Sequence, residues 1–230
     1  MVRLKRILRW GYHSLLFVCT QLTFFLGSVF YALRRAKRTR RKILIVRLDE
    51  IGDMVLMSPF LRELRHGCPQ ARITLVVKPA VFNLVELCPY VDEVLAYPRA
   101  AGRFAPFLHI WQAFSFARKN LWAKEFTLAI VPRFDADASY GAGWLAFFSG
   151  AKRRLGYPSC ALPSKEKTDR GLDRLYTDFV PVRPGVCHEV ERNLDVLRYL
   201  GIEIHSEELE VWTDAQDEAR AEELLSIRGA

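Results

Sequence analysis

The chain has 230 residues, half of them hydrophobic and 26% charged, with 34 Lys and Arg against 26 Asp and Glu. This composition is too apolar for a disordered protein and too charged for a polytopic membrane protein, and the length allows one domain with a substantial core. The formal net charge of +8 raises the question of nucleic-acid binding, so we first ask where the charge lies.

The positive charge is concentrated in the first 42 residues. They contain eleven basic side chains and no acidic one, which leaves 23 basic groups against all 26 acidic groups in the rest of the chain. The body of the protein is therefore mildly acidic. We expect no nucleic-acid partner, and we interpret the basic leader as an address at an anionic membrane surface.

The leader contains an apolar segment, since residues 10–33 include no Asp, Glu, Lys or Arg. Fourteen of the 20 residues at 14–33 are apolar, and a helix of that length spans about 30 Å, the thickness of the hydrocarbon core of a bilayer. Trp10, Tyr12 and Tyr31 lie near its ends, where aromatic rings favour the membrane interface. We expect residues 1–42 to be a membrane anchor or an interfacial helix flanked by basic clusters.

Two alternatives remain for this segment. A cleaved signal peptide fits poorly, because no small-x-small cleavage site follows and seven basic residues come directly afterwards. A buried core helix would not need basic clusters on both sides. Because the heavier basic cluster is C-terminal to the segment, we expect the body to lie at the cytoplasmic face of the inner (plasma) membrane.

The body alternates short apolar runs with helical patterns. Runs that predict strands lie at 43–46, 73–77, 91–97, 127–131 and 154–157, with one further strand-like piece at 209–212. Helical patterns lie at 54–66, with a restart at Ser58-Pro59, and at 80–87, 104–124, 139–148, 188–200 and 214–227, while 162–184 reads as irregular. The alternation predicts an α/β fold with a Rossmann-like parallel sheet over residues 43–212, preceded by an N-terminal hydrophobic helix.

The five cysteines are odd in number, widely spaced and form no C-x-x-C pair. They suggest neither a disulfide framework nor a zinc site, and we expect no metal.

The first loop of the predicted sheet holds the residues most suited to chemistry. Ligands of such sheets bind at the carboxyl ends of the strands, where this chain has Asp49-Glu50-Ile51-Gly52-Asp53. The loop has neither glycine-rich nucleotide-binding pattern, and three carboxylates would repel a phosphate. They suit hydrogen bonds to hydroxyl groups or general-base catalysis. The plainer alternative is that Asp53 caps a helix and Gly52 relieves the turn.

Several segments in this order resemble glycosyltransferase family 9, the ADP-heptose:lipopolysaccharide heptosyltransferase family. They are Lys42 to Asp53 followed by Ser58 to Arg65, Ile73 to Pro79, Leu87 to Val94, Val131-Pro132-Arg133 with Asp135 and Asp137, and His188 to Leu194. The resemblance covers residues 42 to about 202.

The resemblance implies the N-terminal domain of a GT-B enzyme, which is metal-independent and transfers a sugar with inversion from a nucleotide donor such as ADP-heptose, without a further cofactor. It implies that Asp53 is the general base and that the domain binds a lipopolysaccharide or related glycolipid acceptor. The residues that we expect to contact this acceptor are Arg47, Asp49, Glu50, Gly52, Lys78, Arg133, Asp135 and Asp137. His188 and Glu191 are expected to organise helix packing.

The chain departs from the family in two respects. Asp49 and Glu50 stand where heptose-transferring members often carry small hydroxyl residues, which leaves the acceptor open. The family's second domain supplies the donor pocket, and residues 213–230 resemble only the approach to it. We therefore expect a membrane-associated transferase whose donor domain is missing from this sequence, or alternatively a non-catalytic membrane-tethered binding module or inactive remnant.

Overall fold

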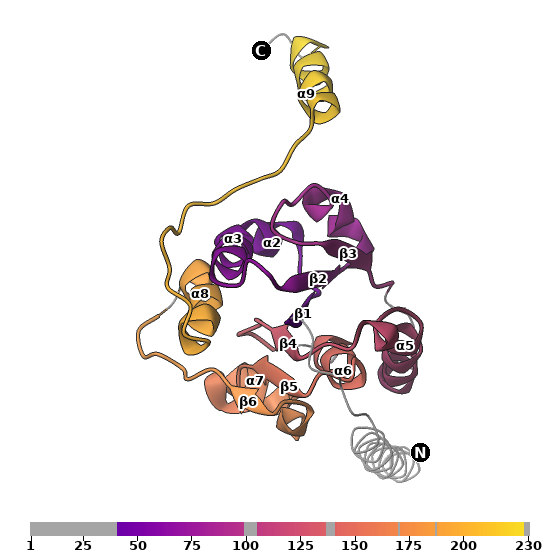
Figure 1. Cartoon of the computed structure of the whole chain (residues 1–230), viewed down its shortest axis with the longest axis vertical. Coiled ribbons are helices and arrows are strands. Elements are labelled where there is room, and N and C mark those ends of the chain that lie inside the picture. Colours follow the sequence, from indigo (N-terminus) through magenta and orange to yellow (C-terminus); the bar gives the residue numbers. More distant parts are fainter. Residues whose placement is uncertain (1–40, 99–104, 137–140, 170, 187, 228–230) are drawn as a thin grey trace, which may run out of the picture.

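The computed structural model describes residues 41–98, 105–136, 141–169, 171–186 and 188–227. They form a six-stranded parallel sheet in the order β3-β2-β1-β4-β5-β6 (Figure 1). The strands are β1 (Lys42–Arg47), β2 (Arg72–Val77), β3 (Glu93–Ala96), β4 (Leu128–Val131), β5 (Arg153–Gly156) and β6 (Asp178–Phe179). The predicted α/β fold with a Rossmann-like parallel sheet is confirmed. The predicted hydrophobic helix at 10–33 lies outside the described residues.

Helices cover both faces of this sheet. They are α2 (Ile51–Val55), α3 (Ser58–Gly67), α4 (Phe82–Val85), α5 (Ala105–Asn120), α6 (Gly141–Phe148), α7 (Pro163–Thr168), α8 (Glu189–Tyr199) and α9 (Ala215–Ile227), with the short 3-10 helices η1 (Pro79–Val81), η2 (Trp122–Lys124), η3 (Ser159–Ala161) and η4 (Asp173–Leu175). Figure 1 shows α3 and α8 on one face and α5 and α6 on the other, while α9 stands apart from the sheet.

The central strand β1 explains why the sheet is buried on both faces. Successive side chains of a strand point to opposite faces, and here both sets are apolar. Ile43 and Ile45 pack into the core beneath α3 and α8, whereas Leu44 and Val46 pack into the core beneath α5 and α6. At most 2% of any of these four side chains is exposed. A continuous apolar run is therefore the correct sequence signal for this strand.

The structure corrects three sequence-based expectations. The helical pattern predicted to begin at residue 54 starts earlier, because α2 already begins at Ile51. The stretch 162–184, predicted to be irregular, contains α7, η4 and the edge strand β6. The predicted strand at 209–212 was wrong: these residues belong to no helix or strand, and Leu209 and Val211 are about half exposed.

This C-terminal segment is bound by the side chain of Arg62 instead of by hydrogen bonds to a neighbouring strand. The guanidinium group of Arg62, on α3, donates to the carbonyl oxygens of Ser206 at 3.0 Å and Glu208 at 3.1 Å, and it forms an ion pair with Glu210. These contacts, together with the hydrogen bond from the backbone N–H of Glu210 to Oγ of Ser58 at 2.8 Å, hold the segment against α3, and no described strand pairs with it.

Glu63 holds the same segment from the next position of α3. Its side chain is 1% exposed and accepts hydrogen bonds from the backbone N–H of His205 at 3.0 Å and from Arg62 at 3.1 Å. Burial works to raise the pKa of Glu63, but these bonds outweigh it and hold the pKa below its ordinary value. The pKa of Glu210 is also lowered, because its bonds with Arg62 and Tyr90 outweigh burial.

Within the described residues, which begin at position 41, no helix is both long and apolar enough to cross a membrane.

Candidate functional site

The candidate site lies where the strand order reverses. From β1 the chain proceeds to β2 and β3 on one side, and then returns to place β4 on the other side of β1. In open α/β sheets, ligands bind at the carboxyl ends of the strands beside such a reversal. The residues at this point are Arg47 to Asp53, which we call the β1 loop although it includes the end of β1 and the first turn of α2, and the β4 loop, which begins with Pro132 and Arg133.

Asp49 is held between two arginines that come from the two strands. Its carboxylate forms an ion pair with Nε of Arg47, at 2.5 Å, and a second ion pair with Arg133. Asp49 and Arg47 are only 5% and 2% exposed. Arg133 also donates to the carbonyl oxygen of Ala136, at 2.9 Å from Nη2. These contacts brace the β4 loop against the β1 loop across the reversal.

Helix α8 completes the surroundings of Arg47. Glu189 accepts from Nη2 of Arg47 at 2.8 Å, and Asn193 accepts from Nη1 at 3.2 Å, while the carbonyl oxygen of Pro132 is a further acceptor. Glu189 and Asn193 were not predicted as site residues, although their i, i+4 spacing places them on one face of the helix. Because its donors are taken up inside the protein, we infer that Arg47 positions Asp49; its predicted contact with the acceptor stays a prediction.

His188 and Glu191 lie at the start of α8, where both make local contacts, and their expected role in helix packing stays a prediction. Nδ1 of His188 accepts the backbone N–H of Val190 at 3.3 Å, which caps the helix, and Glu191 forms an ion pair with Arg183 at 2.6 Å.

Glu50 and Lys78 form an ion pair at the same edge of the sheet. Lys78 follows β2, and its ammonium group forms an ion pair with the carboxylate of Glu50, which is 75% exposed. The hydrogen bond and the positive charge of Lys78 lower the pKa of Glu50. The structure thus brings together two predicted site residues that lie 28 positions apart in the sequence.

Asp53 is the remaining carboxylate of the first loop. It occupies the third position of α2, and its Oδ2 accepts the backbone N–H of Glu50 at 3.2 Å. Glu50, not Asp53, is the N-cap residue. No ion pair involves Asp53 among the residues that the structure describes. Next to it, Gly52 lies inside α2, where a Cβ atom would meet nothing within 4 Å, so the space above this turn is open.

The three acids therefore differ in what they can do. Asp49 and Glu50 are each neutralised by cations, whereas the partners of Asp53 within the described residues are a backbone N–H and the N-terminal end of a short helix. A carboxylate in this state can accept a proton from a bound hydroxyl group. Within the described part of the chain, no group of three or more His, Cys, Asp or Glu is arranged to hold a metal ion.

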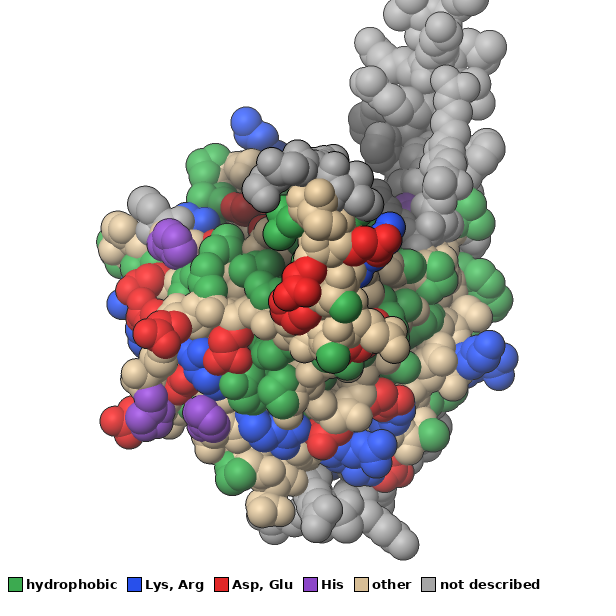
Figure 2. Space-filling model, turned by 90° about the horizontal axis from the view of Figure 1, so that it is seen from above, with side chains coloured by type: hydrophobic (Ala, Val, Ile, Leu, Met, Phe, Trp, Pro, Cys, Tyr) green, Lys and Arg blue, Asp and Glu red, His purple; other side chains and the backbone are tan. Residues whose placement is uncertain are grey.

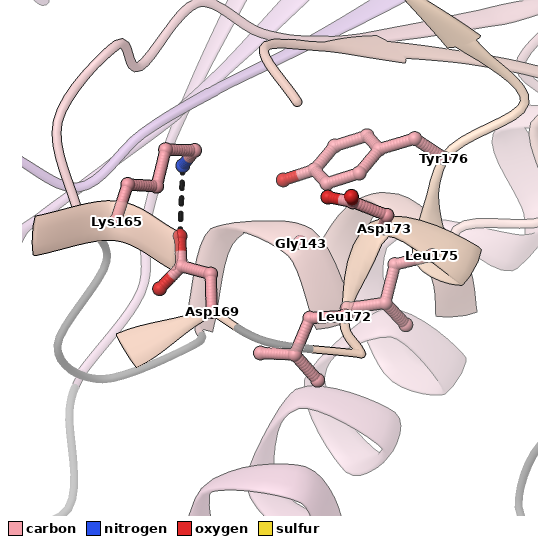
Figure 3. Close-up of a pocket in the computed structure, with 7 residues that line it drawn as sticks. All are labelled: Gly143, Lys165, Asp169, Leu172, Asp173, Leu175 and Tyr176. Atoms are coloured by element: carbon pink, nitrogen blue, oxygen red, sulfur yellow. Dashed lines mark hydrogen bonds and ion pairs between the residues drawn. The ribbon is translucent and has the colours of Figure 1, made fainter. Parts of the chain in front are cut away.

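A small cavity beside the β4 loop does not provide a substrate site. It lies between the Lys165–Asp169 ion pair and Tyr176, whose hydroxyl group points towards that pair (Figure 3). Its volume is about 20 Å³, which is room for one water molecule. Nζ of Lys165 also donates to the carbonyl oxygen of Asp135, at 3.2 Å, so this cluster supports the loop. The Asp135 side chain is exposed, and Asp137 lies outside the described residues.

One face of the protein is seen in Figure 2, from the side of α9. Acidic and basic side chains are interspersed over this face, with apolar side chains between them. The expected absence of a nucleic-acid partner stays a prediction.

Comparison with solved structures identifies the architecture. A glycosyl transferase family 9 structure from Veillonella parvula DSM 2008 has a TM-score of 0.65 at 20% identity, over 83% of this chain and 50% of that chain. The E. coli heptosyltransferase WaaC with ADP has a TM-score of 0.54 at 16% identity, over 74% of this chain and 50% of that chain. E. coli ADP-heptose lps heptosyltransferase II has a TM-score of 0.51 at 18% identity, over 80% and 50%.

The chain has the fold of one half of a family 9 glycosyltransferase. The structural resemblance expected from the sequence motifs is thereby confirmed. In sequence, 54 residues are 33% identical to a Haemophilus influenzae protein that carries a provisional glycosyltransferase name, over 24% of this chain and 16% of that protein. No protein-family profile matches the chain. The chain spans about half the length of these solved structures.

Proposed function

We propose that this chain is the acceptor-binding half of an inverting glycosyltransferase of the heptosyltransferase type. In this proposal the described domain holds a glycolipid acceptor such as a lipopolysaccharide core. A second Rossmann-like half binds the nucleotide-sugar donor. The donor class is suggested by the relatives, whose structures contain ADP and ADP-2-deoxy-2-fluoro heptose, and no cofactor is required beyond this substrate.

The observation that carries the proposal is that two of the three acids after β1 are paired with cations, whereas the third, Asp53, has no such partner among the described residues. A general base must be ionised and accessible when the acceptor arrives. Asp49 is buried between Arg47 and Arg133, and Glu50 is paired with Lys78. Asp53 has no such cation among the described residues and borders the open space above Gly52. We therefore assign the role of general base to Asp53.

The proposed reaction is a single displacement. The acceptor hydroxyl oxygen attacks the anomeric carbon of the donor sugar and forms the new glycosidic bond. The bond from that carbon to the diphosphate breaks, and its electron pair leaves with the nucleoside diphosphate. The hydroxyl proton passes to the carboxylate of Asp53. Attack from the side opposite the leaving group inverts the anomeric configuration.

The remaining predicted residues divide into two roles in this proposal. Lys78, Glu50 and Asp135 are the polar groups at the edge of the sheet that we assign to the acceptor. Arg47 and Arg133 hold Asp49, and with it the relative positions of the β1 and β4 loops, because their guanidinium groups are occupied by protein acceptors. Gly52 leaves room for the acceptor beside Asp53.

We further propose that the protein works at the cytoplasmic face of the inner membrane. The support is the charge distribution of the leader: an apolar segment at 10–33 with basic clusters on both sides. A lipid-linked acceptor would be presented at the same surface. Full-length protein should remain in the membrane fraction after carbonate extraction, and a variant lacking residues 1–42 should not.

The catalytic assignment is tested by sugar transfer in the complete enzyme, that is, this chain together with its donor-binding half. Asp53→Asn should lower kcat by about 10²–10⁴-fold, the usual contribution of a general base. The matched control is Asp217→Asn, because Asp217 accepts the backbone N–H of Asp214 at the same 3.2 Å in α9, far from the site. Wild-type turnover in Asp53→Asn would remove Asp53 from the role of base.

The second candidate function is a membrane-tethered binding module without catalysis. It is favoured by the pairing of two of the three acids after β1, because Asp49 and Glu50 are already bound by cations of the protein itself. The two functions separate in one experiment: the module binds the acceptor saccharide but yields no transfer when the donor-binding half and the nucleotide sugar are supplied.

A further inference from the structure

A second polar cavity lies at the edge of the sheet opposite the candidate site. It is found where β1 and β2 begin and where η2 leads into β4, and its volume is about 240 Å³. Its lining residues are Lys42, Arg72, Thr74, Ala123, Lys124 and Phe126. The site at the carboxyl ends of the strands uses none of them.

The sheet register places the cationic groups together. Lys42 and Arg72 are direct partners in the parallel pairing of β1 with β2, so their side chains leave the same face of the sheet on strands about 4.8 Å apart. Thr74 is two residues further along β2 and shares that face. Lys124 reaches the cavity from η2.

The charges in this cavity do not cancel. Lys124 forms an ion pair with Glu93 at 2.6 Å, and Oγ1 of Thr74 donates to the same carboxylate at 3.3 Å. Lys42 and Arg72 form no ion pair with any residue that the structure describes, although the charge of Arg72 helps to lower the pKa of the nearby Asp92 carboxyl. The cavity therefore has three cations and one paired carboxylate, Glu93, and an anion is the ligand that such a group attracts.

The cavity is large enough for a phosphate group. Its volume of about 240 Å³ lies just below the roughly 300–1,000 Å³ of pockets for drug-sized ligands.

We propose that this cavity binds the phosphate group of an anionic lipid. The position of Lys42 in the chain argues for a lipid source, because only eight residues separate it from Leu33, the last residue of the apolar segment. The nine chain steps from Leu33 to Lys42 span at most about 32 Å, so Lys42 stays within that distance of the end of the segment. The strand β1 has six residues and is about 20 Å long, so the candidate site at its carboxyl end lies about that far from the cavity at its beginning.

The test compares lipid binding to the full chain in nonionic detergent by native mass spectrometry. The chain is mixed with equal amounts of phosphatidylglycerol and phosphatidylcholine. The double variant Lys42→Gln/Arg72→Gln should bind phosphatidylglycerol roughly tenfold more weakly than wild type. The control Lys167→Gln/Arg220→Gln removes the same charge from α7 and α9 and should bind like wild type. Arg72→Lys, which keeps the charge, should bind within about twofold of wild type.

Each other result overturns the proposal. An equal loss in both double variants would mean that only net charge matters. Unchanged phosphatidylglycerol binding in Lys42→Gln/Arg72→Gln, with circular dichroism showing a folded protein, would mean that the cavity holds no lipid phosphate. Calorimetry with inorganic phosphate distinguishes the source: saturable phosphate binding that is lost in this variant, without an effect on the lipid, would assign the cavity to free phosphate.

Discussion

Replacing Arg47 with methionine should destabilise the domain by about 3 kcal/mol. Arg47 is 2% exposed and serves four acceptors, among them the carboxylates of Asp49 and Glu189. Removing one partner of a buried ion pair costs about 3–5 kcal/mol, because the other charge is left without compensation. Asp49 keeps Arg133 in the variant, so we expect the lower end of this range.

The measurement is urea unfolding of the full chain in nonionic detergent, followed by tryptophan fluorescence. The control is Arg220→Met, which removes an exposed arginine paired with Glu223 and should cost about 0–1 kcal/mol. Arg47→Lys should fall between the two, because it keeps the charge but loses the planar fork. If Arg47→Met is no less stable than Arg220→Met, the buried cluster does not hold the two loops together.

Two further predictions concern packing and pH. Gly156→Ala should lower the free energy of unfolding in urea by about 1–3 kcal/mol, because the new Cβ atom would lie 2.6 Å from the ring of Tyr176. Gly52→Ala should raise it by about 0.5–1 kcal/mol, because its Cβ atom would meet nothing within 4 Å. Equal effects of the two substitutions would refute the packing argument. Because the pKa values of Glu63 and Glu210 are lowered from 4.5, their contribution to stability is present above about pH 4.5 and is lost as the pH falls through the lowered values. Glu63→Gln/Glu210→Gln should therefore flatten the decline in the urea midpoint between about pH 5 and pH 3, and an unchanged decline would contradict this.

The sequence was most informative where structure depends on local patterns. The apolar run at β1 and the start of α3 at Ser58-Pro59 were predicted because burial on both faces of a strand and proline in the first turn of a helix leave signals within a few residues. The N-cap residue of α3 is Met57, one position before Ser58. The strand predicted at 209–212 does not form, and the contacts that hold this segment are with side chains of α3: Arg62 pairs with the Glu210 carboxylate, and Ser58 accepts the backbone N–H of Glu210, about 150 positions away in each case. The edge strand β6 has only two residues and therefore leaves almost no pattern.

The candidate site shows the same limit. The three acids after β1 were visible in the sequence, and so was the importance of their position at the end of a strand. The sequence did not show which of these acids are paired with cations, because the cations come from three separate places: Arg47 on β1, Lys78 after β2 and Arg133 in the β4 loop. Glu189 and Asn193 were missed since their partner, Arg47, lies on a strand more than 140 residues earlier.

The most direct test of the central claim is the rate of sugar transfer by the complete enzyme with Asp53 intact and replaced. Asp53→Asn should lose about 10²–10⁴-fold in kcat, while Asp217→Asn should keep the wild-type rate. Wild-type kcat in Asp53→Asn would contradict the claim that Asp53 accepts the acceptor proton.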